Sequence, residues 1–238
     1  MIKLAIFDLD GTLTKTNKID SECFIRALEE ANGLSEIQTD WAAYPHTSDS
    51  GIIRHIFQER FHRLPEFAEL FSFKQRFVAL LNNCWLADSS RFAAVSGAAT
   101  ALARLRSESD WAVALATGCW RLSALMKLRA AEIEVDGIPA TFADDGIARE
   151  EILQLAVVKA LEYYEQNEFE KIVSIGDAVW DVQTAANLEV AFLGIGSGEN
   201  AVRLCQAGAG RVIDDFAEYD QFVQSLNEAE IPRVSRVS

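Results

Sequence analysis

Basic residues are in short supply in this sequence. Among its 238 residues, 22 Lys and Arg stand against 36 Asp and Glu, so the formal net charge at pH 7 is −14. Non-specific nucleic-acid binding requires an excess of Lys and Arg that neutralises phosphates. The composition therefore argues against a nucleic-acid partner. It leaves room for a small anionic substrate, because local cations or a bound metal can supply positive charge at one site.

Long apolar runs and regularly spaced cysteines are also missing. No apolar stretch reaches the roughly 20 residues that a bilayer span needs, and Asp8 and Asp10 interrupt any signal-peptide-like run near the start. We therefore expect no signal peptide and no membrane partner, and no protein partner is implied. The cysteines share no metal-site or disulfide spacing, which favours a reducing, cytoplasmic location. They are Cys23, Cys84, Cys119 and Cys205.

Apolar residues make up half of the chain, which is enough for a sizeable core. The length suits one large domain, or one domain that carries a smaller insertion. Residues 3–7 form an apolar run that is too short for a helix, so we expect a buried strand. Residues 15–90 then show apolar residues at helical spacing only. Helices are expected near residues 19–31, 52–61 and 65–85.

After residue 90 the pattern changes to apolar runs that alternate with helical stretches. Such alternation predicts a parallel sheet with right-handed crossovers. The expected fold class is therefore α/β: a Rossmann-like parallel-sheet core with helices on both faces, plus an inserted all-helical cap domain. The core would comprise residues 1–14 and 91–238, and the cap residues 15–90.

Polar residues follow three of the expected strands. Asp8 and Asp10 follow the first strand, in "DLDGT", and Thr117 ends "WAVALAT". Asp177 ends "KIVSIGD", and Asp181 lies four residues further on, which would put both on one face of a helical turn. Ligands of open parallel sheets bind at the carboxyl ends of the strands, and paired carboxylates suit a hard cation such as Mg²⁺. Acidic residues and glycine also form ordinary turns, but the three motifs together favour a catalytic edge.

In these motifs and their order, the chain resembles the haloacid dehalogenase-like hydrolase superfamily, on its phosphatase branch near the phosphoglycolate phosphatases and β-phosphoglucomutases. "DLDGT" is similar to the first motif of that family, "LATG" to the second and "GDAVWD" to the fourth. The resemblance covers essentially the whole chain, and the insertion after the first strand matches the family's helical cap. It implies a Mg²⁺-dependent phosphomonoester hydrolase that acts on a small phosphorylated metabolite through an aspartyl-phosphate.

The resemblance also implies a role for each matching residue. Asp8 would be the nucleophile, and Asp10 would be the general acid and then the general base. Thr117 and the amide of Gly118 would bind phosphoryl oxygens. Mg²⁺ would offset the repulsion between carboxylates and phosphate. Its ligands would be the Asp8 carboxylate, the Asp10 carbonyl, Asp177 and, close by or through water, Asp181.

The third motif departs from the family pattern, which usually has a Lys, often as "KP", shortly before the strand of the fourth motif. No "KP" occurs here. Arg149 lies at the equivalent junction of loop and helix, and Lys159 lies deeper in the same helix. We favour Arg149 as the catalytic and phosphate-binding cation, because a guanidinium can bind phosphate through two hydrogen bonds. A surface position in the first turn of the helix remains an alternative for Arg149.

The stretch "HTSDSG" in the expected cap would face the catalytic edge when the cap closes. Residues 14–18 and 89–96, which are polar or small, could act as the hinges of that closure. An ordinary helix start, with Ser48 or Asp49 as the N-cap, would explain the same stretch. The candidate contacts to the non-phosphate part of the substrate are His46, Thr47 and Asp49.

Four other functions remain open. A phosphosugar mutase of the β-phosphoglucomutase type would use the same aspartyl-phosphate and return the phosphoryl group to a sugar. A dehalogenase would need no metal and would lack the second aspartate, whereas Asp10 is present. A phosphonatase would need a cap lysine for a Schiff base, and neither Lys18 nor Lys74 has a context that supports this. An inactive binding or regulatory protein would not need the intact carboxylates.

Overall fold

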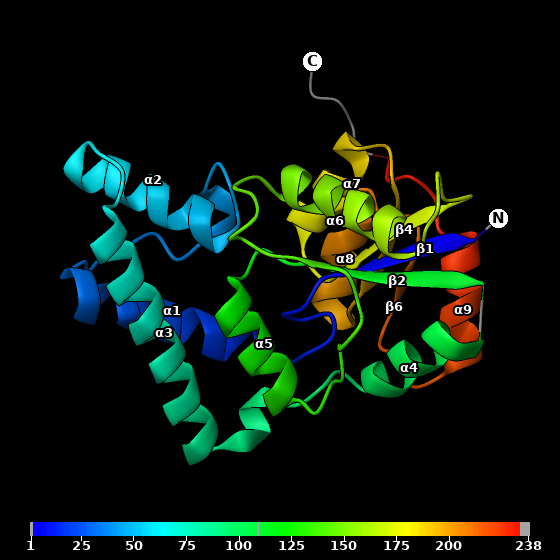
Figure 1. Cartoon of the computed structure of the whole chain (residues 1–238), viewed down its shortest axis with the longest axis horizontal. Helices are drawn as coiled ribbons and strands as arrows, with labels where there is room; N and C mark the ends of the chain where they lie inside the picture. Colours follow the sequence, from blue (N-terminus) through cyan, green and yellow to red (C-terminus); the bar gives the residue numbers. More distant parts are fainter. Residues whose placement is uncertain (1, 109, 234–238) are drawn as a thin grey trace.

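The computed structural model of the chain describes residues 2–108 and 110–233. Within these residues, a six-stranded parallel sheet has the strand order β3-β2-β1-β4-β5-β6 (Figure 1). The strands are β1 (Lys3–Phe7), β2 (Trp111–Ala116), β3 (Ala140–Thr141), β4 (Ile172–Gly176), β5 (Ala191–Ile195) and β6 (Val212–Ile213). β1 lies between β2 and β4 and pairs in parallel with both. The expected parallel sheet is confirmed.

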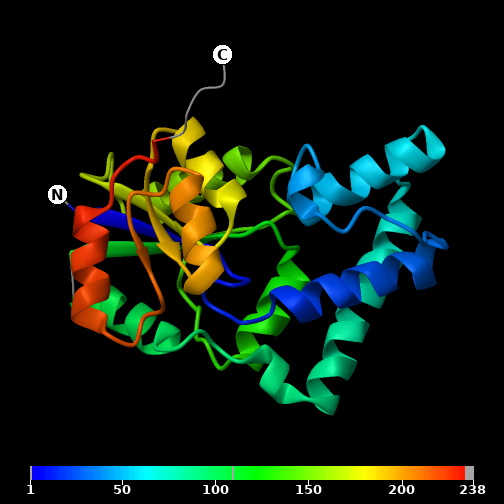
Figure 2. The ribbon, with the colours of Figure 1, turned by 180° about the vertical axis from the view of Figure 1, so that it is seen from behind.

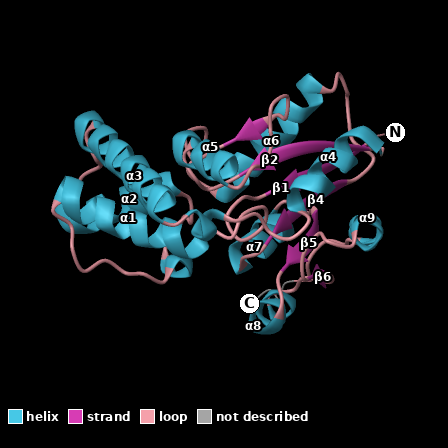
Figure 3. Cartoon of the chain, turned by 90° about the horizontal axis from the view of Figure 1, so that it is seen from below, coloured by secondary structure: helices cyan, strands magenta, loops and turns pink. Residues whose placement is uncertain are grey.

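Helices cover both faces of the sheet, as Figure 3 shows. They are α4 (Ala98–Glu108), α5 (Arg121–Ala130), α6 (Arg149–Tyr163), α7 (Val179–Asn187), α8 (Gly198–Gln206) and α9 (Tyr219–Glu228). Phe7 of β1 shares an apolar cluster with Leu102 of α4 and Phe222 of α9. Its neighbour Ile6 points to the other face and shares a cluster with Ile152 of α6. Because β1 is buried on both faces, it reads as a continuous apolar run.

The helical insertion lies to one side of the sheet (Figures 1 and 2). Its elements are α1 (Asn17–Asn32), α2 (Asp49–Phe61) and α3 (Phe67–Ala87), with the short 3₁₀ helices η1 (Trp41–Ala43) and η2 (Ser89–Phe92). These helices pack around a separate apolar cluster that includes Phe24, Phe57 and Phe77. The expected all-helical insertion into an α/β core is therefore confirmed. Among the described residues, every helix falls short of the length or the hydropathy that crossing a bilayer requires.

The two segments that connect the insertion to the sheet run side by side. The N–H of Lys15 donates to the carbonyl of Ala93 (2.8 Å), and Thr14 and Ala94 form an antiparallel bridge. The polypeptide therefore enters and leaves the insertion at one place, which is the arrangement that a hinge requires. Hinge motion here, and the domain boundaries after residues 14 and 90, remain predictions.

Candidate active site

The carboxyl ends of three neighbouring strands form the candidate active site. Asp8 directly follows β1, Thr117 follows β2 and Asp177 follows β4. All three line one cavity of about 370 Å³ between the sheet and the helical insertion. The three sequence motifs thus meet at one edge, because the carboxyl ends of parallel strands lie together.

The turn after β1 depends on Gly11. Its φ is +79°, and a side chain at this position would collide with the carboxylate of Asp177 and the amide of Asn17. Glycine tolerates both the left-handed backbone and such a close approach. Asn17, at the start of α1, donates to Oδ2 of Asp177 (2.9 Å). The glycine of the first motif therefore lets the fourth motif come close to it.

Asp8, Asp177 and Asp181 form a compact acidic cluster, in which one carboxylate oxygen from each lies within 4.8 Å of the others. Burial raises the pKa of Asp8, although Arg149 opposes this effect. Burial also raises the pKa of Asp181 to about 7, and that of Asp177 well above its ordinary value. Crowded, buried carboxylates gain stability from a divalent cation, and oxygen donors are the ligands that hard divalent cations prefer. The cluster could therefore hold a divalent metal ion.

Asp177 and Asp181 come together in a different way from the expected helical turn. α7 begins at Val179, so Asp177 precedes the helix and does not share a helical face with Asp181. Oδ2 of Asp181 accepts the N–H of Ala178 (3.1 Å), and the carbonyl of Asp177 accepts the side-chain amide of Asn200 (2.9 Å). The expected face was wrong, because the chain bends at residues 177–178 and becomes helical only at Val179. Both carboxylates nevertheless reach the cluster.

Arg149 lies beside Asp8. Nη1 of Arg149 is 3.2 Å from Oδ1 of Asp8, and Nη2 is 3.4 Å from Oδ1 of Asp181. A Cβ atom at Gly118 would lie 3.1 Å from Nε of Arg149, so the guanidinium lies directly against the second motif. This Nε is buried and has no hydrogen-bond partner among the described residues. The N–H at Nε of Arg149 is thus available to donate a hydrogen bond to a ligand beside Asp8.

Substituting Arg149 with alanine is expected to lower activity about 10- to 100-fold, the loss that corresponds to a hydrogen bond with a charged group. Lys159→Ala should have little effect, because the Nζ of Lys159 binds the carbonyl of Ala140 and the carboxylate of Asp145 instead of Asp8. Steady-state kinetics of the two variants test this. A larger loss for Lys159→Ala would show that the third-motif cation has been assigned to the wrong residue.

Asp10 contacts a lysine that the sequence analysis missed. Lys127 of α5 is fully buried, and its Nζ donates to the carboxylates of both Asp10 and Asp20 at 2.5 Å. Burial alone would raise the pKa of Asp10, but the charge of Lys127, together with hydrogen bonds from Cys119, Lys127 and Thr16, lowers it below its usual value. Lys127 therefore favours the carboxylate form of Asp10 in the protein without substrate.

A signal for Lys127 is present in the stretch "RLSALMKLRA". The buried residues of α5 are Ser123, Ala124, Lys127 and Leu128, which share the inward face of the helix. A lysine at an inward position needs a carboxylate partner, and helical spacing does not reveal which one. The sequence analysis also missed other residues that line the cavity: Asn17, Asp20, Asp40, Trp41, Trp180, Asn200 and Arg203.

The "HTSDSG" loop lies against the core. The N–H of Asp49 donates to the carbonyl of Gly118 (2.7 Å), and Oδ2 of Asp49 accepts the N–H of Trp120 (2.9 Å). Ser48 caps α2 and also donates to the carbonyl of Ile147 (2.5 Å). Of the two expected N-cap residues, Ser48 is therefore the cap, while Asp49 binds Gly118 of the second motif through its backbone N–H and Trp120 through its side chain.

Two of the three candidate substrate contacts in this loop reach the cavity. Thr47 and Asp49 line the same cavity as Asp8, whereas His46 lines a neighbouring cavity together with Arg149. Burial raises the pKa of Asp49 to about 8. Burial therefore favours the protonated form of this carboxyl group.

Comparison with known proteins agrees with the motifs and the fold. The sequence model of the haloacid dehalogenase-like hydrolase family matches residues 2–189, and no curated protein matches the chain. A hydrolase from Pseudomonas syringae is 19% identical with a TM-score of 0.70, over 95% of this chain and 99% of its own. A β-phosphoglucomutase from Clostridium difficile is 17% identical with a TM-score of 0.68, over 96% of this chain and 98% of its own. A phosphonoacetaldehyde hydrolase-like protein from Oleispira antarctica is 16% identical with a TM-score of 0.67, over 95% of this chain and 93% of its own.

At these identities, the likeness to solved structures shows a shared fold. The family match goes further, because it covers most of the chain and contains all three strand-end motifs, from Asp8 to Asp181. The chain belongs to the haloacid dehalogenase-like hydrolase family.

Proposed function

We propose that this protein is a Mg²⁺-dependent phosphomonoester hydrolase that acts on a small phosphorylated metabolite through an aspartyl-phosphate at Asp8. The observation that carries the proposal is the guanidinium of Arg149, which lies beside Asp8 with its buried Nε unpaired. A phosphoryl oxygen would accept a hydrogen bond from that donor. The adjacent carboxylate cluster supplies the oxygen ligands for the cation.

In the first step, a carboxylate oxygen of Asp8 attacks phosphorus, and the bond from phosphorus to the leaving oxygen breaks. Asp10 gives a proton to the leaving oxygen. The hydroxyl of Thr117, the N–H of Gly118 and the guanidinium of Arg149 bind the phosphoryl oxygens. Bound Mg²⁺ would supply positive charge that reduces the repulsion between carboxylate and phosphate.

In the second step, Asp10 takes a proton from a water molecule while that water attacks phosphorus. The bond between Asp8 and phosphorus breaks, which releases inorganic phosphate and restores the carboxylate. The contact with Lys127 favours the carboxylate form of Asp10, which accepts the proton in this step. For the first turnover, Asp10 takes its proton from the monoanion of the phosphomonoester, whose second pKa is about 6. In later turnovers, Asp10 already carries the proton that it took from water in the second step.

Substituting Asp177 with alanine is expected to affect the Mg²⁺ requirement more than any other property of the enzyme. Asp177 belongs to the acidic cluster and, unlike Asp8 and Asp181, forms no ion pair with Arg149 within the described residues. The Mg²⁺ concentration that gives half-maximal activity should rise about 10- to 100-fold or more. Magnesium titrations of activity and of binding heat measure this, with the exposed Asp220→Ala on α9 as the control. An unchanged titration would remove Asp177 from the ligand set.

The cap is proposed to select the substrate. Residues 15–90 would form a cap domain over a core of residues 1–14 and 91–238, in a cytoplasmic enzyme. Thr47→Ala and Asp49→Asn should change the ranking of phosphorylated metabolites. Activity on a metabolite should fall roughly 5- to 150-fold, which corresponds to about 1–3 kcal/mol, where the variant removes a hydrogen bond to it. Hydrolysis of p-nitrophenyl phosphate, which lacks such groups, should stay close to that of the wild type. Equal losses on every substrate, or no loss on any, would show that the loop only begins α2 and anchors it.

A screen of phosphorylated metabolites with and without Mg²⁺ tests the proposed function. Mg²⁺-dependent release of inorganic phosphate supports a hydrolase. Formation of an isomeric sugar phosphate without free phosphate would support the mutase, which shares the aspartyl-phosphate. Binding of a metabolite with no turnover would support an inactive binding protein and contradict the proposal.

A further inference from the structure

Lys127 joins two carboxylates that come from opposite sides of the boundary between the sheet and the helical insertion. Asp10 follows β1, and Asp20 lies in the first turn of α1. The helix that carries Lys127, α5, lies between the sheet and the insertion (Figures 1 and 2). The lysine side chain is fully buried, and the two carboxylates are 14% and 16% exposed. A single ammonium group therefore connects the insertion to a proposed catalytic residue.

Both carboxylate oxygens of Asp10 are held. Oδ1 accepts a hydrogen bond from the hydroxyl of Thr16. Oδ2 accepts from Nζ of Lys127 and from the thiol of Cys119, 2.7 Å away. With partners on both oxygens, the carboxylate has one preferred orientation. Without Lys127, the weak thiol donor would be the remaining partner of Oδ2 among the described residues.

Stability alone does not account for this arrangement. Removing one ammonium and two carboxylates from water costs several kcal/mol per ion, and apolar replacements of such groups are often neutral or stabilising. A buried charge network does, however, define a unique geometry, because each member is fixed by its partners. Orientation is what a group that transfers protons requires.

We propose that Lys127 is a positioning residue for the proton transfers of Asp10. The inference rests on the proposed function. Lys127 touches neither the phosphoryl group nor the metal ligand oxygens in this scheme. It acts by holding the Asp10 side chain where the leaving oxygen arrives.

The test compares two esters of nearly the same shape, p-nitrophenyl phosphate and p-nitrobenzyl phosphate. The phenolate is a good leaving group that needs little protonation, whereas the benzyl alkoxide depends on a proton donor. Single-turnover rates report the first step, formation of the phosphorylated enzyme. Lys127→Met should lower the maximum of the pH–rate profile for the benzyl ester about 10²-fold and that for the phenyl ester by no more than about threefold. Comparing the maxima removes the effect of any change in the protonation of Asp10.

A second variant separates positioning from folding. Lys127→Met leaves two buried carboxylates facing each other and lowers stability, whereas the double variant Lys127→Met/Asp20→Asn removes one of them. The double variant should recover most of the lost melting temperature but keep the selective loss for the benzyl ester. Recovery of the benzyl-ester rate together with the melting temperature would overturn the inference, because Lys127 would then be a structural residue only.

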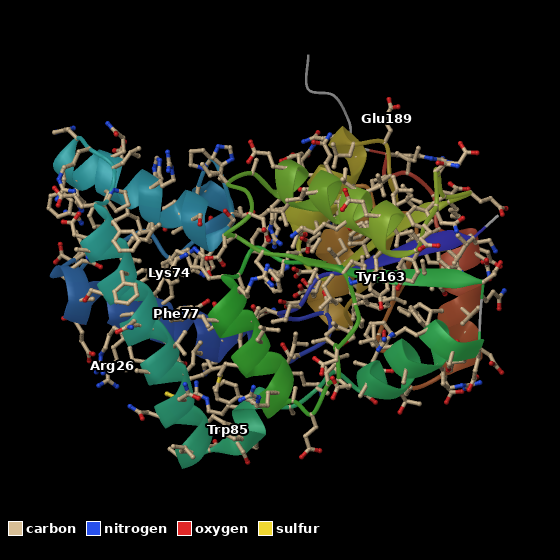
Figure 4. All side chains as sticks on the ribbon, viewed as in Figure 1. Arg26, Lys74, Phe77, Trp85, Tyr163 and Glu189 are labelled. Atoms are coloured by element: carbon tan, nitrogen blue, oxygen red, sulfur yellow. The ribbon has the colours of Figure 1, made fainter. Side chains whose placement is uncertain are left out.

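Lys74→Met is the matched control. Lys74, on α3 (Figure 4), forms another lysine bridge between the insertion and the core, through Asp144 (2.7 Å), without touching Asp10. Its substitution should change the two ester rates equally or not at all. Equal losses on both esters for Lys127→Met, or a selective benzyl-ester loss for Lys74→Met, would overturn the inference while the proposed function stands. A wild-type protein that hydrolyses neither ester nor any phosphorylated metabolite would overturn both.

Discussion

Asp8→Asn is expected to abolish turnover while the fold remains intact. The amide is nearly isosteric with the carboxylate, but it is a poor nucleophile. By comparison with removal of other enzyme nucleophiles, the loss should be on the order of 10⁴- to 10⁶-fold. The melting temperature should stay the same or rise, because burial raises the pKa of Asp8 and the charged form is therefore disfavoured in the fold.

Phosphate release under saturating Mg²⁺, together with the melting temperature, measures the effect of Asp8→Asn. The exposed Asp220→Asn on α9 is the control for the loss of one negative charge from a strongly acidic chain. Mass spectrometry of the quenched wild-type reaction should find the phosphoryl group on a peptide that contains Asp8. Phosphate release by the variant at the wild-type rate would rule out the aspartyl mechanism.

Asp10→Asn should lower the rate by about 10²- to 10⁴-fold, the usual contribution of general acid–base catalysis. An amide can neither protonate the leaving oxygen nor accept a proton from water, so both chemical steps suffer. Binding of the phosphoryl group should change little, because the proposed phosphate-binding residues Thr117, Gly118 and Arg149 remain. The variant should therefore lose kcat, while the inhibition constant of inorganic phosphate stays near that of the wild type.

The same variant also removes one of the two carboxylates that balance Lys127. The remaining partner is Asp20, so the buried ammonium keeps one counter-charge and the protein should still fold. Circular dichroism and the melting temperature verify this before the kinetics are compared. Full activity of Asp10→Asn would mean that the second aspartate of "DLDGT" is only a turn residue.

The meeting of the three motifs at one edge of the sheet could be predicted because its signals are local. An apolar run followed at once by Asp8, Thr117 or Asp177 marks a strand end, and parallel strands bring such ends to one side. The helical insertion was equally visible, because helical spacing interrupts the strand–helix alternation for residues 15–90. The detailed approach of Asp177 to Asp181 was not predictable, since it depends on where α7 begins relative to the strand end, and helix boundaries are weakly encoded.

The sequence by itself determined the fold class, the insertion and the set of carboxylates at the sheet edge, since these follow from hydrophobic periodicity and from residues adjacent to strand ends. Only the tertiary structure decided which cationic side chains form ion pairs with those carboxylates. Arg149 reaches Asp8 from a position 141 residues away, and Lys127 reaches Asp10 and Asp20 across 117 and 107 residues. Charge pairing at such separations leaves no periodic trace, because helical spacing can place Lys127 on the inward face of α5 but cannot show which carboxylate it meets. The burial of Lys127 follows from how α5 packs between the sheet and the insertion, and packing is a property of the whole chain.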